Sequence, residues 1–314
     1  MNKAALFCLA LGALAMTATA QEHLKSLDGK GLNQKISPKE DFYGYVNTTW
    51  MENHQLTPEY SRYGQFNILN DSSNNRVQRL VMGLAATNPA KGTNAYKIAN
   101  IYELAMDSVR RNREGAAPIK PLLAKIEGTA PADMDELLVW MHRNYGSPFF
   151  STGPQEDLGN SKVYAMYLGS TGLGLGDRDY YLKKDKKNQN ILKAYDKLIQ
   201  TDMVLAGYSK KDAKRIAQNV IKIETLLADS TWSREESRNI PAMYNVRTLA
   251  QVKEMYPNIP WNNWFEKTMN IKAPETLIVT EINTVKQADN LLKSLTDREK
   301  KDYYLWDLVL SLIH

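Results

Sequence analysis

The stretch DYYLWDLVLSLIH, residues 302–314, decides how this sequence folds. In helical form it would carry apolar side chains on every side of its axis: Tyr303, Tyr304, Leu305, Trp306, Leu308, Val309, Leu310, Leu312 and Ile313. A helix that is apolar all round has to be buried. No Gly, Asn or Pro follows to end it. We therefore expect an interior helix of a helical domain, and one whose packing partners are incomplete in this chain.

The segments before this stretch predict further helices, most with an apolar face and ordinary end signals. Thr93 and Ser209 stand where N-caps belong, and Asp133 with Glu136 has the spacing of a capping box. In the segment after Ser209, the apolar residues recur at spacings of three and four. The predicted helices lie within residues 94–107, 118–128, 132–146, 188–208, 209–229, 248–268 and 283–297.

One region departs from the helical pattern. Residues 161–175, SKVYAMYLGSTGLGL, combine aromatic and aliphatic residues in partial alternation with glycines, which indicates a strand that runs into a turn. Residues 148–157 are expected to be its hairpin partner, joined through residues 158–161. The predicted fold class is therefore mainly α with a small β-hairpin element, and incomplete at its C-terminus.

Composition indicates a folded protein without an electrostatic preference for nucleic acid. The chain is 43% hydrophobic and 24% charged, and its net charge of +5 is spread over mixed segments. Its one basic cluster, KKDKK at residues 183–187, is short and follows the acidic residues of DRD, so we interpret it as a solvated loop. No nucleic-acid partner is expected.

The N-terminus has the pattern of a secretory signal peptide. A basic start, MNK, precedes the apolar run of residues 4–16, and ATA at residues 18–20 predicts cleavage near Ala20. The run is too short for a stable transmembrane anchor. The alternative is a buried N-terminal helix. Exported protein, periplasmic or extracellular, is the expectation, with residues 21–40 as an extended lead-in and residues 41–314 as the folded region.

Residues able to do chemistry are scarce. The single cysteine, Cys8, lies inside the apolar run, so the processed chain would hold no disulfide, thiol nucleophile or Cys-based zinc site. The sequence contains neither His-Glu-x-x-His nor Gly-x-Ser-x-Gly. His142 is interpreted as a structural residue whose position in the last turn of a helix suits a cation. We predict no catalytic residue and no metal ligand.

Arg62 is the candidate binding residue. It lies among Tyr60, Tyr63 and Phe66 and close to Gly64. A guanidinium framed by aromatic rings offers paired donors to a carboxylate and keeps its charge. The alternative is a structural arginine that stacks on Tyr63 or pairs with a nearby acid. Local sequence leaves both interpretations open.

Three longer segments carry a resemblance to a known family. Residues 41–71, DFYGYVNTTWMENHQLTPEYSRYGQFNILND, resemble the opening of the neprilysin-like zinc endopeptidases, peptidase family M13. Residues 172–182, GLGLGDRDYYL, resemble a second segment of that family, with Gly176 in place of its usual proline. Residues 233–261, SREESRNIPAMYNVRTLAQVKEMYPNIPW, are similar to a third. DRDYYL and the Tyr-Asn pair of the third segment are expected to be structural.

The resemblance implies an N-terminal region, most of a helical lid-type domain over an active-site cavity. Family members are longer, and their HExxH motif and downstream glutamate belong to a C-terminal part that has no counterpart here. Zinc is therefore implied as the cofactor of a full-length enzyme, and none is expected to bind this chain. The final helix matches the family as far as about Ser311 and is expected to be cut off from its packing partners.

The resemblance also assigns two substrate-binding residues. Arg62 matches an arginine that helps bind the substrate's C-terminal carboxylate, and Phe66 matches a phenylalanine that helps wall a substrate pocket. Asn67 and Asn70 depart from an acid and an arginine found at those positions in relatives, so details of the pocket do not carry over.

The function expected from all this is the substrate-enclosing N-terminal region of a secreted zinc metalloendopeptidase that acts on oligopeptides, inactive without its catalytic region. Its expected partners are oligopeptides and the missing C-terminal catalytic region. Two alternatives stay open: a non-catalytic secreted helical module that binds peptides, and the non-functional product of a truncated gene.

Overall fold

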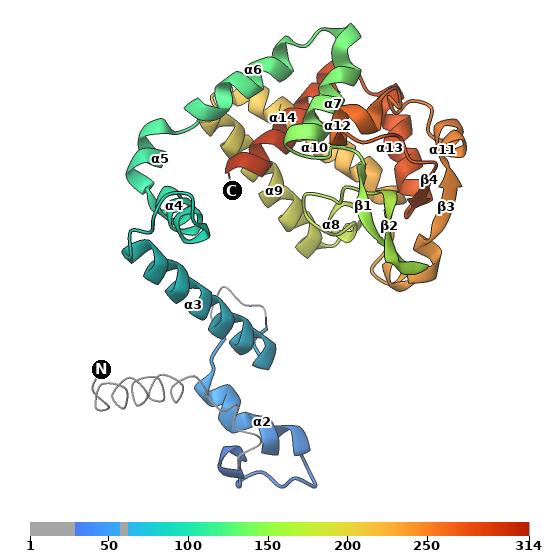
Figure 1. The fold of residues 1–314 in the computed structure, drawn as a ribbon. Helices are drawn as coiled ribbons and strands as arrows, with labels where there is room; N and C mark the ends of the chain where they lie inside the picture. The colour runs from blue at the N-terminus through green and yellow to red at the C-terminus, as the bar shows by residue number, and fades with distance from the viewer. Residues whose placement is uncertain (1–28, 57–61, 314) are drawn as a thin grey trace, which may run out of the picture. The chain divides into compact units, whose positions relative to one another are not determined.

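The computed structural model describes residues 29–56 and 62–313, which form two compact units (Figure 1). Unit 1 ends at Ser108 and unit 2 begins at Val109. The predicted signal peptide, residues 21–28 of the predicted lead-in, and Tyr60 lie outside the described residues. Each unit is described by itself.

The regular elements of the described part of unit 1 are helices. They are η1 (Gly29–Gly31), α2 (Phe42–Asn53), α3 (Gln65–Ala86) and α4 (Asn94–Met106). Asp41 caps α2, because its Oδ1 accepts the Gly44 N–H at 2.8 Å. Thr93 caps α4 as predicted, accepting the Tyr96 N–H at 3.1 Å. Helices α3 and α4 pack against each other. Only Gly44 and Ala99 are buried among the described residues of this unit.

Unit 2 contains the hydrophobic core. Its helical elements are α5 (Ser108–Glu114, which starts at the boundary), η2 (Ala117–Ile119), α6 (Lys120–Gly128), η3 (Pro131–Asp133), α7 (Met134–Asn144), α8 (Asp179–Leu182), α9 (Lys186–Leu205), α10 (Lys210–Ser230), η4 (Glu236–Arg238), η5 (Ile240–Met243), α11 (Leu249–Met255), α12 (Trp264–Met269), α13 (Ile282–Ser294) and α14 (Asp297–Ile313).

Helix α10 is the central element of this unit, in contact with α8, α9, α13 and α14. Its N-cap is Ser209, as predicted, with the Oγ accepting the Asp212 N–H at 3.1 Å. The predicted apolar stripe is fully buried: Ala213, Ile216, Val220, Ile223 and Leu227. The helical periodicity of this segment was therefore sufficient to identify its buried face.

Helix α14 is the interior helix that its sequence predicts. Side chains 302–306, Leu308 and Val309 are buried, and α6, α9 and α10 contact the helix. These side chains are therefore buried by elements of the same unit. This corrects the expectation that the packing partners of the helix are missing, because segments well before it in the sequence supply them.

A small sheet accompanies the helices of unit 2. Strands β1 (Ser151–Asp157) and β2 (Asn160–Gly169) form the predicted antiparallel hairpin around Leu158 and Gly159. Two short strands were not predicted: β3 (Asn245–Thr248) and β4 (Thr276–Val279). The order is β1-β2-β4-β3, with β2 and β4 parallel and β3 antiparallel to β4. The mainly α class holds, with a mixed four-stranded sheet instead of a lone hairpin.

Two local predictions fail for stated physical reasons. Asp133 precedes α7, but residues 131–133 form a 3-10 turn and its side chain makes no cap hydrogen bond. Glu136 instead forms an ion pair with Lys267 of α12. The predicted loop at residues 183–187 is in part the start of α9, where Asp185 caps the helix by accepting the Lys187 and Asn188 N–H groups, each at 3.1 Å.

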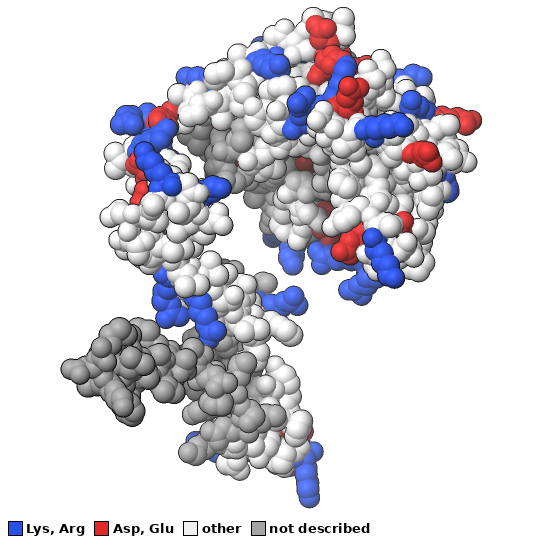
Figure 2. Space-filling model, in the orientation of Figure 1, with Lys and Arg blue, Asp and Glu red and all other residues white. Residues whose placement is uncertain are grey.

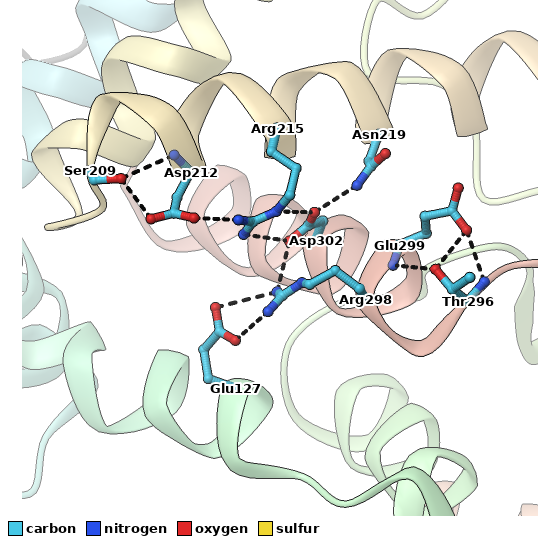
Figure 3. Close-up of polar contacts among 9 residues, drawn as sticks. All are labelled: Glu127, Ser209, Asp212, Arg215, Asn219, Thr296, Arg298, Glu299 and Asp302. Atoms are coloured by element: carbon cyan, nitrogen blue, oxygen red, sulfur yellow. Dashed lines mark hydrogen bonds and ion pairs between the residues drawn. The ribbon is translucent and has the colours of Figure 1, made fainter.

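A buried carboxylate joins three helices of unit 2 (Figure 3). Asp302 of α14 is fully buried and accepts hydrogen bonds from Arg215 Nε at 3.1 Å and Asn219 Nδ2 at 2.7 Å, both on α10. Arg298 Nη2 lies 2.7 Å from the other oxygen of Asp302, and Arg298 Nη1 reaches Glu127 of α6 at 2.6 Å. Paired and hydrogen-bonded in this way, a buried charge is tolerated.

Candidate peptide-binding site

The two predicted substrate-binding residues lie at the N-terminal end of α3. Gly64 precedes the helix in an extended conformation, and its N–H donates to Asn67 Oδ1 at 3.1 Å. In return the Gly64 carbonyl accepts the Asn67 N–H at 3.0 Å. Asn67, one of the departures from the family resemblance, thus fixes the helix start, with Arg62 just before it and Phe66 in its first turn.

Both predicted residues are exposed. Phe66 is 89% exposed, far more than an apolar ring in a finished core would be. Tyr63 does not serve as a platform for Arg62, because its ring stacks on Trp50 at 6.4 Å and its hydroxyl donates to Asp71 at 2.8 Å. Within residues 29–56 and 62–313, Arg62 forms no ion pair and lies over no aromatic ring. Its donors point to no partner in that part of the chain.

Residues 63–65, which follow Arg62 in the sequence, form one wall of an apolar cavity of about 560 Å³. Helix α2 supplies most of the rest, including Tyr43, Val46, Trp50 and His54. The rings of Trp50 and His54 stack at 4.4 Å, and His54 Nδ1 lies 2.9 Å from the Trp50 carbonyl, which holds the imidazole in place. Pockets with apolar walls and few polar groups suit an apolar side chain.

The described histidines and acids do not fit a zinc site. No group of three His, Cys, Asp or Glu side chains that could hold a metal occurs in residues 29–56 and 62–313. The ring of His142 packs on Phe150 at 4.7 Å and on Trp264 at 4.8 Å, contacts that suit the structural role predicted for it. Burial lowers the pKa of His142 to about 4, so it is neutral and not the helix-end cation that its position suggested. We therefore derive no zinc chemistry from these residues.

The second and third resembling segments hold each other in place. Asp177 of the second segment forms an ion pair with Arg234 of the third, and Arg178 Nη1 donates at 2.6 Å to the carbonyl of Thr231, just before the third segment begins. Gly176 adopts φ of +72°, a conformation that the family's proline cannot take, so the turn differs here. In the third segment, Tyr244 donates to Asp157 of β1 at 2.8 Å. These contacts are of the kind expected from the structural role predicted for DRDYYL and the Tyr-Asn pair.

One residue with unusual chemistry was missed. Glu224 lies on α10 and is 3% exposed, although it is an acid. Its position in the sequence could have indicated that it is buried. It lies four residues after Val220 and three before Leu227, on the apolar stripe. An acid on a buried face requires partners, and its contacts are described below.

In a comparison with known proteins, the model of peptidase family M13 matches residues 38–314. Endothelin-converting enzyme 1 of Bos taurus is 26% identical over 314 residues, covering 96% of this chain and 40% of that protein. Neprilysin-3 of Drosophila melanogaster is 26% identical over 317 residues, covering 93% of this chain and 39% of that protein. The chain thus spans about two fifths of the length of these relatives.

Solved structures agree. The zinc metalloprotease Zmp1 of Mycobacterium tuberculosis, in complex with an inhibitor, matches with a TM-score of 0.79 and 25% identity over 91% of this chain and 44% of its own. PepO of Lactobacillus rhamnosis HN001 matches in fold, with a TM-score of 0.73 and 18% identity, over 88% of this chain and 43% of its own. The matched part is the N-terminal region of the family, and the chain belongs to peptidase family M13.

Proposed function

We propose that this chain is the N-terminal, substrate-enclosing region of a secreted zinc metalloendopeptidase that cuts oligopeptides. Membership of family M13 supports the peptidase class. The absence of His-Glu-x-x-His from the 314 residues supports a division of labour in which a separate catalytic region holds the zinc. This region then contributes binding and orientation of the peptide, which lower the barrier by fixing its geometry before reaction.

The observation that carries the proposal is that Arg62 is exposed and directly precedes residues 63–65, which line an apolar cavity. A guanidinium offers parallel N–H donors that match the two oxygens of a carboxylate. In the proposed role, Arg62 binds the C-terminal carboxylate of the peptide, and Phe66 covers an adjacent side chain. These two contacts would favour short peptides with a free C-terminus.

Unit 1 also offers a surface for the catalytic region. Large apolar side chains of α3 and α4 are exposed, among them Leu80 at 68% and Ile101 at 67%. Scattered apolar residues are normal on a surface, but several on the same pair of helices indicate a contact area. We assign this surface to the catalytic region of the complete enzyme.

Export is proposed from the N-terminal pattern of residues 1–20. Among the helices of the described part, none has both the length and the apolar character needed to cross a membrane. On the face drawn in Figure 2, basic and acidic side chains of unit 2 are interspersed, which is why we propose peptides and not nucleic acid as ligands.

Kinetics of the complete enzyme with Arg62→Ala would test the proposal. Each peptide substrate is compared with its C-terminal amide. We expect kcat/KM for the free acid to fall about ten- to hundredfold, since charge-assisted hydrogen bonds contribute roughly 1.5–3 kcal/mol. The value for the amide should hardly change. Arg62→Lys keeps the charge without the fork and should lose less.

Arg79→Ala is the matched control, an exposed arginine of α3 whose Nε donates to the Asn75 carbonyl within the same helix. It should leave both substrates unaffected. Equal losses on acid and amide would show that Arg62 does not bind the carboxylate. Reading the gene beyond codon 314 tests the larger claim, because a segment with His-Glu-x-x-His must be found there or on a partner chain.

A non-catalytic peptide-binding module is the second candidate, favoured by the extensive core of unit 2. In that case the purified chain should bind free-acid peptides without cutting them, with or without added zinc. A truncated, non-functional product would instead bind hydrophobic dyes and melt without cooperativity. Calorimetry and a peptide-cleavage assay on the same preparation distinguish these cases.

A further inference from the structure

Glu224 accepts three hydrogen bonds from three different segments of unit 2. Its Oε2 accepts the Tyr181 hydroxyl of α8 at 2.7 Å. Its Oε1 accepts the Tyr195 hydroxyl of α9 and the Gly174 N–H, each at 3.3 Å. Gly174 belongs to the glycine-rich loop of residues 170–176, so one carboxylate of α10 connects two helices and a loop.

The hydrogen bonds around Glu224 have a defined direction. The Leu175 N–H donates to the Tyr181 oxygen at 3.0 Å, and the Trp306 indole N–H donates to the Tyr195 oxygen at 2.9 Å. Each hydroxyl oxygen therefore already accepts a hydrogen and directs its own toward Glu224. An ionised carboxylate only accepts, whereas a protonated one must also donate. Protonation therefore adds a hydrogen for which none of these three donors is an acceptor, and it removes the charge that strengthens the bonds from Tyr181, Tyr195 and Gly174.

Among residues 29–56 and 62–313, no cation forms an ion pair with Glu224. The titratable groups that face it are Tyr181 of α8, Tyr195 of α9, and Tyr303 and Asp307 of α14. Asp307 adds a second acid, and its Oδ2 is buried without a hydrogen-bond partner in the described part of the chain. On α13, which also packs on α10, the acid Asp289 is engaged by Lys286 and Asn258.

These opposing effects place the titration near neutral pH. Burial is the largest influence and raises the pKa of Glu224 to about 7, while the bonds from Tyr181, Tyr195 and Gly174 act in the opposite direction. Burial also raises the pKa of Asp307, to about 6. Both protonation states of Glu224 are therefore accessible in an exported protein exposed to modest acidification.

We propose that Glu224 is a proton-operated latch, which holds the glycine-rich loop on α10 when it is ionised and loosens the loop when it is protonated. The contact is close, because a Cβ at Gly174 would lie 2.9 Å from Glu224 Oε1. The same loop lines a cavity of about 370 Å³ with Arg178, Trp232 and Arg234. The shape of that polar cavity thus depends on the charge of a residue behind its wall.

Hydrogen–deuterium exchange of the full chain tests the latch, followed by mass spectrometry of peptides that cover residues 170–178. Protection is corrected for the intrinsic pH dependence of exchange. We expect protection of this segment to fall at least threefold between pH 8 and pH 5.5, with a midpoint near 7. Glu224→Gln cannot ionise, so its protection should be the same at both pH values. Glu136→Gln, an exposed glutamate of α7, is the matched control and should behave like the wild type.

Asp307→Asn keeps Glu224 and removes the neighbouring negative charge, so the midpoint should move to lower pH. This variant also serves if Glu224→Gln fails to fold. A wild-type segment whose corrected protection does not change between pH 5.5 and 8 would overturn the proposal. So would a change of equal size in Glu224→Gln, or a midpoint that Asp307→Asn leaves in place.

Discussion

In α10 of unit 2 the apolar stripe from Ala213 to Leu227 is buried, whereas in α4 of unit 1 Ile98 and Ile101 are 40% and 67% exposed. Both helices have an N-cap that the sequence predicted, and both have an apolar face. The difference is that α10 is surrounded by helices of its own unit, while the extensive helix contact of α4 within its unit is with α3. An amphipathic pattern identifies which face of a helix is apolar, but it does not show which segment packs on that face.

The largest expected difference between the units comes from truncating a large side chain. Trp306→Ala in α14 should lower the free energy of unfolding of unit 2 by about 3–5 kcal/mol, because Trp306 is 1% exposed and its indole N–H donates a hydrogen bond to the Tyr195 hydroxyl. Leu80→Ala in α3 should change stability by no more than about 0.5 kcal/mol, since it is 68% exposed. Urea unfolding followed by circular dichroism measures both. Similar losses from the two variants would show that unit 1 has a core of its own.

The second effect concerns the buried charges. Asp302→Ala should cost about 3 kcal/mol, because Arg215 and Arg298 lose the carboxylate that both contact. Glu136→Ala breaks the more exposed pair with Lys267 and should cost no more than about 1 kcal/mol. The same denaturation assay compares them. If Asp302→Ala cost no more than the exposed pair, the network in Figure 3 would not contribute to stability.

The smallest effect is a pH dependence at the start of α14. Lys222 and the Thr296 N–H and hydroxyl lower the pKa of Glu299 to about 2. A lowered pKa in the folded state gives stability above pH 4.5 that is lost as the pH falls toward 2. Glu299→Gln should therefore be less stable than the wild type by about 1 kcal/mol at pH 7. Thermal melts should show this gap closing below pH 4.5, and a constant gap would contradict the assignment.

Much of unit 2 could be predicted from local pattern. The stripe of α10, the cap at Ser209 and the hairpin of β1 and β2 follow from residues close together in sequence. Strands β3 and β4 could not be found in this way, since each is four residues long and pairs with a distant segment. The cap at Asp133 failed because the chain makes a 3-10 turn there.

In the candidate site, too, features set by local sequence could be predicted and features set by distant residues could not. Arg62 and Phe66 lie at the start of α3, a helix outside the predicted ranges, and their assignment as binding residues came from the family resemblance. Glu224 was overlooked because its importance lies in Tyr181, Tyr195 and Gly174, which are 29 to 50 residues away. His142 was correctly judged structural, but its charge depends on burial by distant rings, which its place at a helix end does not reveal.

Strand β1 is an edge of the sheet in unit 2, and Pro154 lies in its middle, opposite Met166. A proline has no amide hydrogen, so β1 would offer one donor fewer to a strand of another molecule that paired with this edge. The acids Glu156 and Asp157 follow after Gln155 and would repel an acidic strand. The sheet is thereby protected from growing by strand addition at β1. Addition of a strand at β1 is therefore not a way in which this edge could bind an extended peptide.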